Sequence, residues 1–162
     1  MIKLKHYSRV LAIQGIYQSL IKDISFGEGL LNVFDIISED LEIYEEVRSP
    51  ENIRFPKLTE LLYKHSDCLS EIQAYAEELT EGVENNKKFF LDFLDKSDKN
   101  RNVERIDYSV LSILFIAMFE MDFVKDLDFQ VSMNEAIELA KEYCDAKSPK
   151  YINAILQSYL EK

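Results

Sequence analysis

Val110-Leu111-Ser112-Ile113-Leu114-Phe115-Ile116-Ala117-Met118-Phe119 lies within the longest apolar run of this 162-residue chain. Because nearly every position is apolar, a helix over about residues 105–121 has to be enclosed by other parts of the protein on most sides. The run is too short to span a bilayer. It therefore predicts the buried central helix of a soluble protein, and no contact with a membrane.

The composition around this helix predicts an all-α fold. Apolar residues make up 47% of the chain and charged residues 30%, which is typical of one globular domain. Only 4 glycines and 3 prolines are present, fewer than the turns of a β-sandwich or a doubly wound fold need. We expect a single domain over 1–162, with an N-terminal helical half over about 1–95 and a C-terminal half over about 103–162.

Apolar spacing predicts two helices at the start of the chain. Residues 8–22 form an amphipathic stripe, in which Gly15 either permits the close approach of another helix or is a tolerated imperfection. Phe26-Gly27-Glu28-Gly29 indicates a turn, and a second helix follows over about 30–44. The stretch from Arg48 to Pro56 is interpreted as a loop.

The remaining pattern predicts further short helices. Residues 58–63, 69–83 and 89–94 suit three separate segments, and the charged stretch from Asp95 to Glu104 suits a surface connection. Ser132-Met133-Asn134-Glu135 has the form of a capping box that would begin the next helix. Ser148 and Pro149 are typical of the N-cap and first position of the last one.

The residue types argue against enzymatic chemistry. Only two histidines occur, and Cys68 and Cys144 stand outside any metal-binding or disulfide pattern. We therefore expect no catalytic residues, no metal, no cofactor and a reducing cytoplasmic location. The charge is uneven, because residues 1–22 carry +4 with no acid whereas the whole chain carries −11. A local anion site near the N-terminus is compatible with this distribution.

Four motifs resemble those of the NusB family of bacterial antitermination factors. The segment 133–141, MNEAIELAK, is similar to the family's INEAIELAK, and 112–121, SILFIAMFEM, is similar to its SILRLALFEL. Residues 8–18, SRVLAIQGIYQ, resemble the family's first helix. Residues 149–156, PKYINAIL, resemble its closing PKFVNAVL, so the motifs occur in order over most of the chain.

The resemblance implies about seven helices in two packed helical bundles and a non-catalytic adaptor. Family members pair with NusE, a small-subunit ribosomal protein, and the pair binds single-stranded boxA RNA. The resulting complexes assemble on RNA polymerase and promote antitermination, notably in ribosomal RNA operons. A homodimer is also compatible with the family.

The family's functional positions, together with the basic residues Lys3 and Lys5 of the N-terminal segment, identify two sets of site residues. The expected RNA-binding residues combine cations with an amide and an aromatic ring: Lys3, Lys5, Arg9, Gln14, Lys150 and Tyr151. The N–H groups at the start of the last helix offer a further place for a phosphate. The expected partner-binding residues are Tyr17 and Ile21.

The sequence departs from the family at several arginines. The N-terminal segment has fewer arginines than the family, and Phe115 replaces an arginine, so we expect weak intrinsic RNA affinity with the partner supplying positive surface.

Two alternatives remain open. One alternative is the NusB-like domain of a ribosomal RNA cytosine methyltransferase, although the chain contains none of that enzyme's cysteine motifs. The other is a purely protein-binding adaptor.

Overall fold

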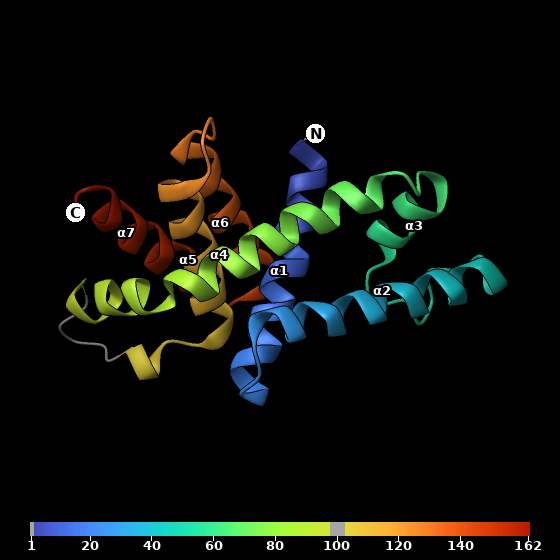
Figure 1. The fold of residues 1–162 in the computed structure, drawn as a ribbon, viewed down its shortest axis with the longest axis horizontal. Helices are drawn as coiled ribbons and strands as arrows, with labels where there is room; N and C mark the ends of the chain where they lie inside the picture. The colour runs from blue at the N-terminus through green and yellow to red at the C-terminus, as the bar shows by residue number, and fades with distance from the viewer. Residues whose placement is uncertain (1, 98–102) are drawn as a thin grey trace. The chain divides into compact units, whose positions relative to one another are not determined.

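A computed structural model describes residues 2–97 and 103–162, apart from the side chains of residues 2 and 3, and the described residues are mainly α-helical (Figure 1). The elements are α1 (Ile2–Lys22), α2 (Phe26–Val47), α3 (Pro56–Lys64), α4 (Cys68–Ser97), a 3₁₀ turn (Val103–Arg105), α5 (Tyr108–Phe123), α6 (Phe129–Tyr143) and α7 (Ser148–Leu160). The all-α prediction is confirmed. Among the described residues, none of the helices combines the length and the hydropathy that crossing a membrane requires.

The chain divides into two compact units, Met1–Glu78 and Leu79–Lys162. The division falls inside α4, whereas the sequence pattern placed it at the charged stretch 95–104. Of that stretch, residues 98–102 lie outside the described residues. Helix α4 begins at Cys68 and runs to Ser97 without a break, so the two segments predicted over 69–83 and 89–94 are one helix.

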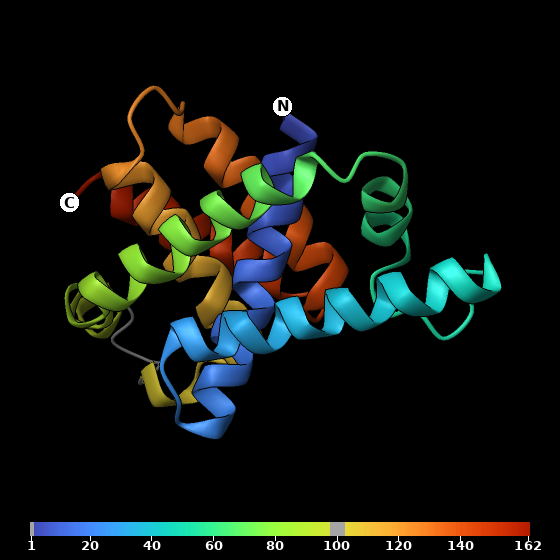
Figure 2. The same cartoon turned by 45° about the vertical axis from the view of Figure 1, so that its right-hand side comes forward.

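The first unit is organised by a close crossing of α1 and α2 (Figures 1 and 2). A Cβ added to Gly29 would lie 2.2 Å from the carbonyl oxygen of Gly15 and 2.0 Å from the hydroxyl of Ser19. A Cβ on Gly15 would lie 2.9 Å from the backbone of Leu30. Only the absence of side chains at both glycines lets the backbones approach this closely, so Gly15 is required by the crossing and is not a tolerated imperfection.

The start of α2 differs from the sequence prediction. Phe26 to Gly29 is the first helical turn and not a separate turn. Ser25 is its N-cap: the Ser25 hydroxyl accepts from the backbone N–H of Glu28, and the Glu28 carboxylate accepts from the N–H of Ser25. These reciprocal hydrogen bonds satisfy two N–H groups that the first turn leaves unpaired, so the helix tolerates two glycines there.

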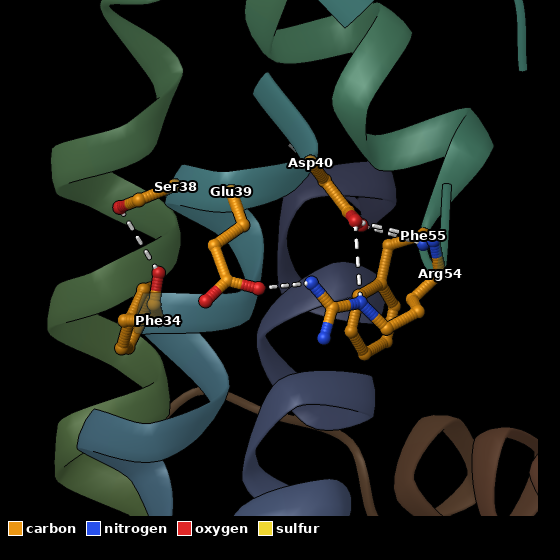
Figure 3. A network of polar contacts seen from close by, with 6 residues as sticks. All are labelled: Phe34, Ser38, Glu39, Asp40, Arg54 and Phe55. Atoms are coloured by element: carbon orange, nitrogen blue, oxygen red, sulfur yellow. Dashed lines mark hydrogen bonds and ion pairs between the residues drawn. The ribbon is translucent and has the colours of Figure 1, made fainter. Parts of the chain in front are cut away.

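A buried carboxylate joins α2 to the start of α3 (Figure 3). Asp40 is fully buried, and its two oxygens accept hydrogen bonds from the backbone N–H groups of Arg54, at 3.3 Å, and Phe55, at 2.9 Å. The Arg54 side chain pairs with both Asp40 and the exposed Glu39. Asp40 thus holds the end of the predicted 48–56 loop, and α3 then adds Leu58 and Leu62 to the core of this unit.

Helix α5, in the second unit, is buried, as its sequence predicted. Every residue from Val110 to Glu120 is buried, and α6 and α7 pack against α5 and against each other. Phe119 lies directly on Gly82 of α4, where an added Cβ would come within 2.2 Å of its ring. Phe115, which replaces the family's arginine, is fully buried beside the ring of Phe90.

Helix α6 begins earlier than its sequence motif predicted. It starts at Phe129, and Asp128 is the N-cap, accepting from the N–H of Gln130. The predicted capping box at Ser132 is therefore wrong: Ser132 lies inside the helix and is buried. The S-x-x-E pattern does not distinguish a helix start from the second turn of a helix that is already capped.

The ends of α5 and α7 are joined by a polar cluster. The hydroxyl of Tyr159 donates to the Asp122 carboxylate, and the ammonium group of Lys162 donates to the same carboxylate at 3.0 Å. That ammonium also lies 3.8 Å from the centroid of the Tyr159 ring. Burial, followed by the hydrogen bond to Asp122, raises the pKa of Tyr159 far above its ordinary value, so the phenol stays protonated.

We expect Gly29→Ala to lower the free energy of unfolding by about 2–4 kcal/mol, because its methyl group would collide with the Gly15 backbone. Gly27→Ala is the matched control on the same helix. Nothing lies within 4 Å of an added Cβ there, so we expect a gain of about 0.5–1 kcal/mol from helix propensity. Urea denaturation measures both, and equal effects of the two variants would contradict the close crossing.

We expect Tyr159→Phe to lower the free energy of unfolding by about 1–2 kcal/mol, because it leaves the aromatic packing intact and removes one hydrogen bond to a charged group. Thermal unfolding measures the change. Tyr151→Phe, which also removes one phenol hydroxyl from α7, provides a comparison. A Tyr159→Phe variant as stable as the parent would show that the contact with Asp122 contributes nothing.

Candidate nucleic-acid interface

The first turns of α1 hold two of the predicted cations. Lys3 lies in α1, but its side chain falls outside the described residues. Lys5 is half-buried, and its ammonium nitrogen lies 4.8 Å from the centroid of the Tyr75 ring on α4. One turn further along α1, the hydroxyl of Ser8 lies 2.9 Å from the carbonyl oxygen of Ile72. Two successive contacts therefore set the start of α1 against the start of α4.

The structure differs from the sequence prediction at Arg9. Its side chain is only 2% exposed, among the largest fully buried side chains of the protein, and it has interactions with the surrounding structure. A guanidinium that binds an RNA phosphate has to reach the surface. Arg9 lies one turn after Lys5 on the same side of α1, at a point where that side of the helix is buried. In this conformation Arg9 is therefore a structural residue.

The remaining predicted residues of α1 form one stripe. Gln14, Tyr17 and Ile21 are spaced i, i+3 and i+7, which puts them within about 60° of one another around the helix. Gln14 is half-buried, whereas Tyr17 is 37% exposed and Ile21 56% exposed. An aromatic and an aliphatic side chain one turn apart at the surface are suited to contact with another protein.

The other two predicted RNA-binding residues lie in the first turn of α7. Lys150 is exposed, and Tyr151 is half-buried with its hydroxyl oxygen inside the protein. Any stacking by Tyr151 therefore has to use the exposed part of the ring and not the hydroxyl. Two of the predicted RNA-binding lysines therefore have described side chains. Lys150, in the second unit, is exposed, and Lys5, in the first unit, is half-buried.

The start of α7 is already occupied by a carboxylate. Asp145 accepts hydrogen bonds from the backbone N–H groups of Lys147 and Ser148, both at 3.0 Å, and from the Ser148 hydroxyl at 2.8 Å. The bonds from the Ser148 hydroxyl and the Lys147 amide lower the pKa of Asp145 below its ordinary value. Asp145 thus uses the N–H groups of Lys147 and Ser148, and its charge disfavours the binding of a phosphate beside them.

Sequence reasoning did not single out Tyr75 or several exposed apolar side chains. Tyr75 sits on the apolar stripe of its helix, and nothing in the sequence places it beside Lys5. Some exposed apolar side chains belong to apolar runs, so the sequence alone suggests that they lie in the core. Whether they are exposed depends on which face of each helix other helices cover. The most exposed of them are Leu31, Val47, Phe89 and Phe123.

We expect Arg9→Ala to lower the free energy of unfolding by about 2–4 kcal/mol, because it removes the packing and polar contacts of a buried side chain. Lys5→Ala, on the same helix, should change it by no more than about 0.5 kcal/mol. Urea denaturation without RNA separates the two. An Arg9→Ala variant with unchanged stability would contradict the structural role and favour direct contact with RNA.

Comparisons with known proteins find relatives over most of the chain. The NusB family model matches residues 6–161. Transcription antitermination protein NusB of Clostridium botulinum (strain Hall, type A) is 33% identical over 149 residues, covering 92% of this chain and 94% of the relative. The protein of the same name from Listeria innocua is 38% identical over 82 residues, 51% of this chain and 64% of the relative. On this evidence the chain belongs to the NusB family.

Proposed function

We propose that this protein is a transcription antitermination factor that binds boxA-type single-stranded RNA jointly with NusE. The observation that carries the proposal is the family match over nearly the whole chain, with relatives named as antitermination proteins along almost their full length. That coverage favours the antitermination factor over the methyltransferase domain. Complexes with RNA polymerase, notably on ribosomal RNA operons, and a location in the cytoplasm belong to the same proposal.

The RNA contact is proposed to depend on a few residues. Lys5 and Lys150 supply positive charge for phosphates, and the ring of Tyr151 supplies a face for a base. Gln14 is a weaker contact, and Lys3 is retained from the positive charge of the N-terminal segment alone. Arg9 acts indirectly, by stabilising the helix that displays Lys5. With so few cations on a protein of charge −11, RNA affinity without the partner is weak.

The partner contact is proposed to use Tyr17 and Ile21. Their side chains form an exposed apolar stripe on α1, and an exposed Tyr is a common anchor of protein interfaces. The same stripe would serve a homodimer, which would then compete with NusE. A purely protein-binding adaptor is the second candidate, favoured by the burial of Arg9 and by the carboxylate at the start of α7.

Fluorescence anisotropy of a labelled boxA-like RNA tests the proposal. The RNA is titrated with this protein, with NusE of the same organism, and with both, at two salt concentrations. We expect the pair to bind at least tenfold more tightly than either protein alone. Lys150→Ala and Tyr151→Ala should weaken joint binding, and Lys150→Ala should lower the salt slope by about 0.7.

Two controls make the outcome decisive. Lys125→Ala removes an exposed lysine outside both predicted sets and should leave RNA binding unchanged. Tyr17→Ala combined with Ile21→Ser should weaken NusE binding, measured by calorimetry without RNA. If NusE binds but adds nothing to RNA affinity, the RNA role is wrong and the protein is a protein-binding adaptor.

A further inference from the structure

Lys5 differs from three lysines of this protein whose ammonium groups lie in ion pairs. Lys64 pairs with Glu60, Lys141 with Glu138 and Lys162 with Asp122, so a carboxylate partly neutralises each of those ammonium groups. Lys5 makes no ion pair among the described residues, and its ammonium lies over the neutral ring of Tyr75. No Asp or Glu occurs in residues 1–22. The contact therefore restrains the ammonium group without cancelling its charge.

The position of Tyr75 is fixed by its own surroundings. Its side chain is only 8% exposed, and its neighbours Ile72 and Ala76 belong to the core of the first unit together with Tyr7 and Leu11 of α1. The hydrogen bond between Ser8 and the Ile72 carbonyl sets α1 against α4 one turn away from the Lys5 contact. The ring is thus a rigid support, whereas the lysine is the flexible partner.

We propose that Tyr75 is a positioning residue for RNA binding, whose ring holds the ammonium group of Lys5 ready for a backbone phosphate. This inference rests on the proposed function. A free lysine side chain loses rotamer entropy when it binds a phosphate. A side chain already held over an aromatic face has lost part of that freedom, so the phosphate contact forms with a smaller entropic cost.

The test measures joint binding of a boxA-like RNA by this protein and NusE, in a double-mutant cycle. Tyr75→Leu keeps an apolar side chain in the core and removes the aromatic face, and Lys5→Met removes the charge. We expect Tyr75→Leu to weaken RNA binding by about two- to fivefold in the parent and to have no effect in the Lys5→Met background. Tyr75→Phe, which keeps the face, should bind RNA like the parent.

The salt dependence adds a readout that a merely structural role would not change. Lys5→Met should lower the salt slope by about 0.7, the contribution of one neutralised phosphate on single strands. Tyr75→Leu should lower it by part of that amount, although it removes no charge. An equal loss of affinity from Tyr75→Leu with and without Lys5 would overturn the proposal, and so would a normal slope in Lys5→Met.

An NMR measurement on the unmodified protein covers the case in which Tyr75→Leu fails to fold. The ring should shift the Lys5 Cε protons upfield, both free and in the complex with NusE and RNA. Loss of that shift on RNA binding would show that the ammonium leaves the ring and would overturn the proposal. If the pair binds no RNA, the proposed function itself fails; if it binds RNA but Lys5 and Tyr75 are uncoupled, only this inference fails.

Discussion

The close crossing at Gly15 and Gly29 is the constraint on which the rest of the first unit depends. With the backbones in contact, α1 has little freedom to rotate about its axis, since any rotation would bring a side chain into the crossing. The Gly15 side of α1 faces α2, and the stripe of Gln14, Tyr17 and Ile21 is held on a different side of the helix. One contact between glycines thus decides which α1 residues are displayed.

Position along α1, and not rotation about its axis, explains why neighbouring cations on this helix differ in role. Lys5 and Arg9 lie one turn apart on the same side of the helix, but Lys5 is half-buried and Arg9 is enclosed. Burial shifts the proposed RNA contact from Arg9 to Lys5 and to the first turn of α7. There Lys150 is exposed, while Asp145 takes up the free N–H groups. An acidic protein with so few available cations is consistent with the proposal that the partner supplies positive surface.

Local patterns predicted helices well and their beginnings poorly. The enclosed helix α5 followed from its apolar run and the loop before Pro56 from its prolines and mixed charge, whereas only the structure decided that Gly15 lies at a close helix crossing. The first turn of α2 was interpreted as a turn between helices because it contains two glycines, although Ser25 and Glu28 cap it. The capping box expected at Ser132 lies inside α6, because Asp128 had already begun that helix. Glycine and S-x-x-E motifs mark helix ends only when the neighbouring turn does not offer a better cap.

The sequence by itself determined the fold class, the buried central helix and the family, because each depends on residue spacing within single helices or on the order of motifs. Only the tertiary structure decided that Arg9 is buried, that Lys5 lies over Tyr75 and that Asp145 occupies the start of α7. The first two depend on helices that are distant in the sequence, and the third on the loop geometry before α7. Exposure of a polar group is a property of what covers it, and a spacing pattern within one helix does not contain that information.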